Sequence, residues 1–239
     1  RQMCIRDREE GTLALTTTQQ PNFSILCADE EHKGVLMAVR NLQEDFFRVT
    51  NTRPYLKIGA KKQVDEGAQK LRILIGSFDK SPLIKQLVKA KKLDVRELKG
   101  KNEKFIITTV TNPIEGVEGE VLLIAGSDKR GTIYGIYELS CQIGISPWYW
   151  WADVPVESHK EIYIKKGVYT DGEPVVQYRG IFINDEWPCM GGWTTERYGG
   201  FNSKMYKHVY ELLLRLKANF LWPATVSYTH LTLPTILLV

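Results

Sequence analysis

Two strands and a helix between residues 174 and 226 limit the fold of this chain more than any other feature. The run 175–184 (VVQYRGIFIN) ends in consecutive apolar residues, as a buried parallel strand does. Apolar residues then recur at helical spacing from Val209 to Leu216, and the run 218–222 (ANFLW) predicts a second strand. Strand, helix and strand form one βαβ unit, the repeat of a (β/α)8 barrel. Because such a barrel needs about 250 residues and this segment holds 53, we expect an incomplete barrel over residues 175–226.

The preceding segment, residues 9–167, alternates strand and helix patterns. This alternation is typical of a sheet covered by helices, so it predicts an α/β fold, a mixed α/β sandwich. Residues 168–174 are polar and contain Gly172 and Pro174, which indicates a linker between two domains. The expected strands are residues 22–28, 55–58, 71–75, 105–110, 121–125 and 162–164, and the expected helices are residues 35–49, 84–88 and 133–143.

Both ends of the chain differ from the body between them. Residues 1–8 (RQMCIRDR) have no periodicity, and residues 227–239 (SYTHLTLPTILLV) contain no Asp, Glu, Lys or Arg, although 25% of the whole chain is charged. We interpret both segments as artefacts, translated adaptor or assembly sequence, and exclude them from the expected fold.

Composition argues against several classes of protein. A net charge of +4 with scattered basic residues does not predict a nucleic-acid partner. No apolar run approaches the roughly 20 residues of a membrane span, so no membrane partner is expected. The cysteines Cys4, Cys27, Cys141 and Cys189 form no C-x-x-C pair and do not cluster with histidine. We therefore expect no metal site and no disulfide framework, but buried free thiols.

Two motifs precede the linker. The loop Gly126–Thr132 (GSDKRGT) has G-x-x-x-x-G spacing, but Thr132 stands where a phosphate loop needs lysine. It therefore predicts a tight turn into a helix capped by Ser127 or Asp128. The run Trp148–Trp151 (WYWW) offers apolar rings on which sugars could stack. Packing of the first domain against the second is the favoured interpretation of these rings.

Polar residues follow both strands of the βαβ unit. Asn184, Asp185 and Glu186 come directly after the first strand, at the end that carries the chemistry in (β/α)8 barrels. Carboxylates placed there can bind sugar hydroxyls or transfer protons. Trp222 ends the second strand and should reach the same mouth, for sugar contact or for packing. The adjacent Asp185 and Glu186 are not expected to be a catalytic pair, because inverting glycosidases hold their carboxyls roughly 6.5–9.5 Å apart across the sugar.

Three long blocks resemble glycoside hydrolase family 115, the xylan α-1,2-glucuronidases. They are residues 125–156 (AGSDKRGTIYGIYELSCQIGISPWYWWADVPV), 178–188 (YRGIFINDEWP) and 199–224 (GGFNSKMYKHVYELLLRLKANFLWPA). The order and spacing of the blocks also agree, and the resemblance covers roughly residues 23–224. After Ala224 the family usually continues with methionine and tryptophan, whereas this chain has Thr225 and Val226.

The resemblance implies a fragment of an inverting hydrolase that removes glucuronic acid, or its 4-O-methyl form, from xylan. It implies no metal or organic cofactor, and a glucuronoxylan partner. The domain before the barrel is similar to the accessory domain of β-hexosaminidases. The family's catalytic acid and base are expected beyond Ala224, so Asn184, Asp185 and Glu186 carry over as substrate-binding residues. We expect the parent to be secreted or periplasmic, because xylan does not cross membranes, and leave open a homo-oligomer of the parent.

Two other functions stay open. The first is a carbohydrate-binding module without catalysis, built on the α/β domain and the rings of Trp148–Trp151. The second is a different sugar hydrolase, such as a β-hexosaminidase-like enzyme. If the barrel is incomplete, its apolar strands and the face formed by Leu212, Leu213 and Leu216 should be exposed and promote association.

Overall fold

The computed structural model describes residues 3–5, 9–59 and 70–224 and divides the chain into two compact units. The N-terminal unit runs to Pro174, and the C-terminal unit begins at Val175. The artefact predicted at residues 227–239 lies outside the described residues. No helix in the described part of the chain is long and apolar enough to cross a membrane.

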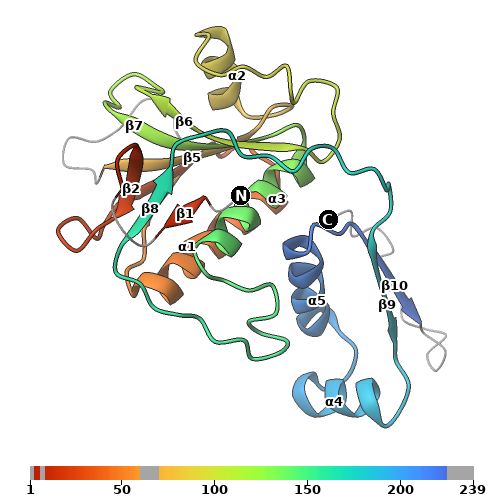
Figure 1. Cartoon of the computed structure of the whole chain (residues 1–239). Coiled ribbons are helices and arrows are strands. Elements are labelled where there is room, and N and C mark those ends of the chain that lie inside the picture. The colour runs from red at the N-terminus through yellow and green to blue at the C-terminus, as the bar shows by residue number, and fades with distance from the viewer. Residues whose placement is uncertain (1–2, 6–8, 60–69, 225–239) are drawn as a thin grey trace. The chain divides into compact units, whose positions relative to one another are not determined.

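A five-stranded sheet organises the N-terminal unit (Figure 1). Its strand order is β4-β3-β5-β7-β6, with every neighbouring pair parallel except β6 and β7. All five strands lie where the sequence predicts them, with ends that differ by one or two residues. They are β3 (Ser24–Cys27), β4 (Tyr55–Ile58), β5 (Leu71–Ser77), β6 (Phe105–Thr111) and β7 (Glu120–Gly126).

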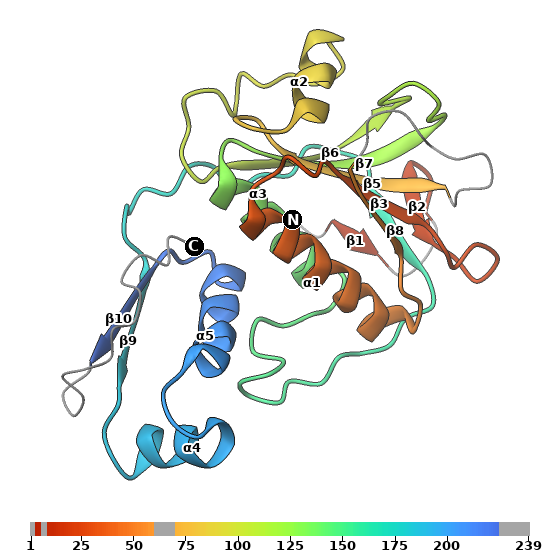
Figure 2. The ribbon, with the colours of Figure 1, turned by 180° about the vertical axis from the view of Figure 1, so that it is seen from behind.

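Three helices cover this sheet. Helices α1 (Lys33–Thr50) and α3 (Lys129–Gln142) lie side by side on one face, and α2 (Pro82–Lys89) lies on the other (Figures 1 and 2). Ser81 caps α2 with its side chain, and Asp128 caps α3. The apolar stripe of α1 is buried as its spacing predicts. The unit is therefore a three-layer α/β/α sandwich, in agreement with the predicted fold class.

A second, antiparallel sheet belongs to the same unit. Strand β8 (Ile162–Lys165) lies between β1 (Cys4–Ile5) and β2 (Thr12–Thr16). The structure thus differs from the expectation that residues 1–8 stand outside the fold: Cys4 pairs with Ile164, and Met3 is buried. The sequence predicted β8 but neither of its neighbours, because two- and five-residue strands carry little periodic signal.

The predicted linker is partly attached to the N-terminal unit. Tyr169 and Ile107 exchange two backbone hydrogen bonds, each 2.9 Å long, at the outer edge of β6. Glu173 accepts from the backbone and the side chain of Asn102 and forms an ion pair with Lys101. The segment from 168 to 174 therefore follows the sheet edge before the C-terminal unit begins.

The C-terminal unit is a βαβ arrangement. Strands β9 (Gly180–Asn184) and β10 (Phe220–Ala224) are parallel, and the helices α4 (Cys189–Tyr198) and α5 (Ser203–Arg215) lie between them in sequence. The predicted strand, helix and parallel strand are confirmed. Ile181 and Phe182 of the first strand are exposed, as are Val175 and Val176, which precede it.

The start of each strand is fixed by hydrogen bonds between Arg179 and Asn219. The Asn219 side-chain oxygen accepts from the Arg179 N–H at 3.0 Å, and the Arg179 carbonyl accepts from the Asn219 N–H at 2.8 Å. The Arg179 guanidinium also donates to the Lys217 carbonyl oxygen at 3.0 Å. These bonds hold Asn219 before the strand, so β10 runs from residue 220 to 224 and not from 218 to 222 as predicted.

Helix α4 was not predicted from the sequence. Its sequence contains Gly191 and Gly192, which lower helix propensity and interrupt the hydrophobic period by which a helix is predicted. The helix ends at Gly199, whose φ of 76° is left-handed, and Asn202 then caps α5 through its side chain. The cap at Gly199 therefore marks the end of α4, and the cap at Asn202 marks the start of α5.

The apolar strand pair is exposed, as expected for an incomplete barrel, whereas the helix is not. The exposed fractions of Phe182 and Trp222 are 56% and 62%. Three leucines form the helical face that was predicted to be exposed. Leu212 and Leu213 are buried, and Leu216 is exposed. The exposed apolar residues of this unit therefore include Ile181 and Phe182 of β9 and Phe220 and Trp222 of β10.

We expect the chain to self-associate through β9 and β10, because exposed apolar strands with open edges pair with other chains. Size-exclusion chromatography should give species larger than a monomer at micromolar concentration. Changing both Phe182→Ser and Trp222→Ser should shift the profile toward monomer. Trp148→Ser, at an exposed ring of the other unit, should leave it unchanged. Monomeric elution of the unchanged chain would contradict this prediction.

Burial was predicted correctly for one of the three cysteines whose burial the structure describes. Cys27 is buried at the end of β3, whereas Cys141 and Cys189 are exposed. Burial, helped by the charge of Glu31, raises the pKa of the Cys27 thiol to about 12. Cys27 is therefore a protonated, unreactive core residue at neutral pH.

Candidate functional site

The ends of β9 and β10 bring the predicted site residues to one edge of the strand pair. The two strands run in register, with Phe182 opposite Trp222 and Asn184 opposite Ala224. Because alternate residues of a strand point to opposite faces, Phe182, Asn184 and Trp222 share a face. The Phe182 and Trp222 rings meet edge to face, with centroids 5.7 Å apart. The structure thus places Asn184 and Trp222 on one exposed surface.

Asp185 differs from its neighbours in burial. Its side chain is 3% exposed, while Asn184 and Glu186 are exposed. Among the residues that the structure describes, neither carboxylate oxygen of Asp185 has a hydrogen-bond partner. Buried polar groups in folded proteins are normally satisfied, so this carboxylate is an exception that needs an explanation.

The surroundings of Asp185 include Tyr206 of α5. Burial raises the pKa of the Tyr206 phenol, and the nearby Tyr210 and the charge of Asp185 raise it further. The Tyr206 and Tyr210 rings are stacked with centroids 6.1 Å apart. Asp185 therefore lies near a protonated phenol on an apolar helix face, an environment that makes an unpaired carboxylate costly.

One exposed aromatic residue at this edge was not singled out by the sequence. Trp187 follows Glu186 directly, is 58% exposed and packs on the first turn of α4. The signal that could have indicated it is the pair Gly191-Gly192 four residues later, since glycines permit close approach of a ring.

The Gly126–Thr132 loop is the predicted tight turn. The Asp128 carboxylate accepts from the Gly131 N–H at 2.8 Å and so caps α3. A Cβ added at Gly126 would lie 2.0 Å from the Thr132 nitrogen, and one at Gly131 would lie 2.2 Å from the Lys104 oxygen. Because protein backbone fills the space at both glycines, the loop offers no cradle for a phosphate.

The Trp148–Trp151 rings do not form a flat platform. The planes of Trp150 and Trp151 are inclined at 80°, with centroids 4.9 Å apart. The Arg48 guanidinium lies 4.8 Å from the centre of the Tyr149 ring. A polysaccharide needs rings that face one way, so the geometry gives little support to a binding module here.

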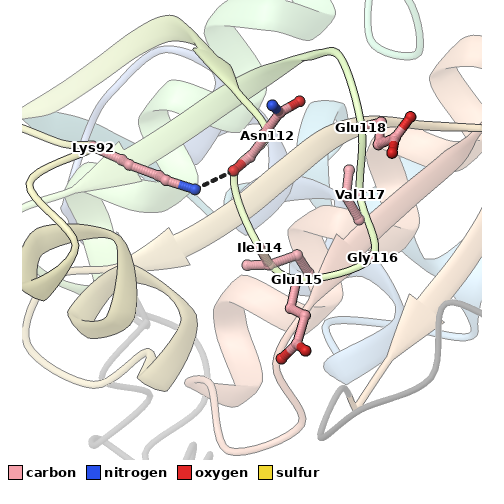
Figure 3. A pocket seen from close by; sticks show the side chains of 7 residues that line it. All are labelled: Lys92, Asn112, Ile114, Glu115, Gly116, Val117 and Glu118. Atoms are coloured by element: carbon pink, nitrogen blue, oxygen red, sulfur yellow. Dashed lines mark hydrogen bonds between the residues drawn. The ribbon is translucent and has the colours of Figure 1, made fainter.

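A surface depression of about 670 Å³ lies between the end of α2 and the β6–β7 loop (Figure 3). The Lys92 ammonium donates to the Asn112 carbonyl oxygen across it. The other lining residues are Ile114, Glu115, Gly116, Val117 and Glu118. None of the residues that the sequence predicts for a site lines this depression.

No metal site is evident within residues 3–5, 9–59 and 70–224, where no three His, Cys, Asp or Glu side chains are placed to hold an ion. The end of β9 carries carboxylate, amide and indole groups. Such groups bind the hydroxyls and the apolar C–H faces of sugars.

Comparison with known proteins agrees with this chemistry. Residues 171–233 match the model of glycosyl hydrolase family 115. A solved structure described as "a novel family GH115 4-O-Methyl-alpha-glucuronidase, BtGH115A, with specificity for decorated arabinogalactans" is 31% identical, with a TM-score of 0.70. The match covers 88% of this chain and 26% of that chain. No sequence among the curated proteins matches.

Two further solved structures are more distant. CpGH84D is 14% identical over 93% of this chain and 29% of its own, with a TM-score of 0.46. The Flavobacterium johnsoniae chitobiase FjGH20 is 12% identical over 93% of this chain and 26% of its own, also with a TM-score of 0.46. A likeness at this level does not define an activity.

The parallel βαβ unit and the carboxylates that follow its first strand lie within residues 171–233, the segment that matches the family model. In this segment and in its structure the chain is similar to glycoside hydrolase family 115, which confirms the resemblance seen in the sequence. It spans 26% of the length of the matched family structure.

Proposed function

We propose that this chain is part of an inverting glycoside hydrolase that removes glucuronic acid, or its 4-O-methyl form, from xylan. The observation that carries the proposal is Asp185, a buried carboxylate without a hydrogen-bond partner among the described residues, at a strand end inside the family-matched segment. A buried carboxylate without a partner lowers the stability of the fold, and at such a position it is suited to binding a ligand.

The pocket residues have separate roles in this proposal. Asp185 accepts hydrogen bonds from hydroxyls of the uronic acid, flanked by Asn184 and Glu186, and Trp222 packs against a sugar ring. Strands β9 and β10 open a (β/α)8 barrel, and the acid and base that invert the anomeric carbon stand on strands after Ala224. The chain by itself is then inactive, and its N-terminal unit is an accessory domain of the β-hexosaminidase type.

The partner of the whole protein is glucuronoxylan in this proposal, and the protein acts outside the cytoplasm, because the polymer does not cross membranes. The matched BtGH115A is described as specific for decorated arabinogalactans, so a decorated galactan is the second substrate to test. No organic or metal cofactor has a role in the proposed reaction.

The test uses an extended chain, in which residues 1–224 are joined to the part of BtGH115A that follows the matched segment. This protein is incubated with glucuronoxylan, decorated arabinogalactan and an aryl β-N-acetylglucosaminide. Release of 4-O-methylglucuronic acid with the main chain left intact is the expected result. Release of the aryl group would favour the β-hexosaminidase-like alternative, and release from none of the three would contradict a glucuronidase.

A further inference from the structure

The indole of Trp187 lies flat on the first turn of α4. A Cβ added at Gly191 would lie 2.8 Å from Nε1 and 2.9 Å from both Cδ1 and Cε2 of this indole. Nearly equal distances to three ring atoms place the Gly191 backbone beneath the face of the five-membered ring. A Cβ at Gly192 would lie 3.7 Å from Cζ3 and 3.9 Å from Cε3, on the six-membered ring.

One face of this indole is therefore covered by helix backbone, and the ring is held against it. The side chain is nevertheless 58% exposed, so its other face is open. Gly191 is itself buried, which fits its place under the ring. An indole seated in this way has lost its rotamer freedom before any ligand arrives, and binding to it costs less entropy.

The position of Trp187 connects it to the candidate pocket. It follows Glu186 in sequence, and Figure 1 shows α4 at the end of the strand pair where β9 stops. The Gly191 N–H donates to the Glu186 carbonyl oxygen at 3.2 Å, which ties the turn under the indole to the strand end. The open indole face therefore stands beside the carboxylates that the proposed function uses.

We infer that Trp187 is a stacking platform for a neutral pyranose ring of the polysaccharide main chain, next to the uronic acid pocket. Pyranose rings have apolar C–H faces that pack on flat aromatic rings. A uronic acid fits less well, because the electron-rich indole face and the exposed carboxylate of Glu186 both repel its negative charge. This inference rests on the proposed function for the location of the pocket.

The test is a fluorescence titration of the whole chain at low micromolar concentration with two undecorated oligosaccharides, xylohexaose and a β-linked galactohexaose. Xylohexaose represents a xylan main chain, and the galactan represents an arabinogalactan main chain. We expect at least one of them to shift the tryptophan emission. The shift should be lost in Trp187→Phe and kept in Trp148→Phe, which removes another exposed indole.

Two glycine variants test the seat of the indole. Gly191→Ala places a methyl group into the ring and should weaken binding about 10-fold or more, because the platform must tilt. Gly192→Ala makes only ordinary contact and should bind like the unchanged chain. Circular dichroism establishes whether each variant is folded. If Gly191→Ala is not folded, Trp187→Ala, which removes the indole, replaces it as the test of binding.

The outcomes separate clearly. A shift with xylohexaose supports a xylan main chain on the platform, and a shift with the galactan supports an arabinogalactan. No shift with either ligand, or a shift that survives Trp187→Phe, overturns the inference. Neither ligand carries a uronic acid, so this result is independent of glucuronic acid release, which tests the proposed function.

Discussion

Replacing Asp185 with alanine in the extended chain is expected to lower the rate of uronic acid release by about 10- to 100-fold. A hydrogen bond to a charged group contributes about 1.5–3 kcal/mol. Both carboxylate oxygens of Asp185 lack a hydrogen bond from any described residue, so both can accept one from a ligand. The assay compares kcat/KM on glucuronoxylan for the unchanged and the substituted protein. Glu196→Ala, at an exposed carboxylate of α4, is the matched control and should keep the full rate.

The same substitution should not destabilise the protein. A buried carboxylate without partners costs free energy, so its removal should leave the melting temperature unchanged or raise it. Loss of release together with equal or higher stability is the signature of a ligand-binding role. A lower melting temperature in Asp185→Ala would instead indicate that this carboxylate supports the fold.

Gly126→Ala is expected to unfold the N-terminal unit or to lower its free energy of unfolding by about 3 kcal/mol or more. The added Cβ would lie 2.0 Å from the Thr132 nitrogen and 2.5 Å from its Cα, and backbone cannot move aside as a side chain does. Inserting extra carbon atoms into a well-packed core costs about 1–3 kcal/mol even where the neighbouring side chains can shift. Urea unfolding followed by circular dichroism measures the change.

Gly167→Ala is the control for this prediction. Gly167 is exposed, and its nearest contact to an added Cβ would be 3.5 Å, on the Tyr169 ring. Its free energy of unfolding should change by less than about 0.5 kcal/mol. Equal stability of Gly126→Ala and Gly167→Ala would show that the turn before α3 is looser than its geometry indicates.

The strands and helices of the N-terminal unit could be predicted because their burial follows a simple period. From Ile73 to Gly76, strand β5 reads as a continuous apolar run, since the strand is covered by helices on both faces. In α1 the buried residues recur every three or four positions. The cap of α3 was predicted at Ser127 or Asp128, because short polar side chains before a helix commonly cap it, and the structure has it at Asp128.

The C-terminal unit was harder to predict because its contacts, not its periodicity, define it. The apolar run of β9 predicts burial, but the described residues leave Phe182 exposed. The start of β10 depends on hydrogen bonds between Arg179 and Asn219, which have no sequence period. Helix α4 was missed because glycine is a poor helix former, although the same glycines seat Trp187.

The candidate site was predictable in position but not in detail. The rule that barrel loops carry chemistry at the ends of strands pointed to Asn184, Asp185 and Glu186. No sequence rule distinguishes the buried member of three adjacent polar residues, and the structure assigns that place to Asp185. Tyr206 of α5 lies close enough to Asp185 for the charge of Asp185 to raise the pKa of its phenol, and no sequence period predicts that proximity.

The most direct test of the central claim is release of 4-O-methylglucuronic acid from glucuronoxylan, measured side by side for the present chain and the extended chain. If substrate-binding residues lie at the end of β9 and the catalytic acid and base lie after Ala224, the extended chain releases this acid and the present chain releases none. Release by the present chain would contradict that division of the active site, and no release by either would contradict the assigned activity.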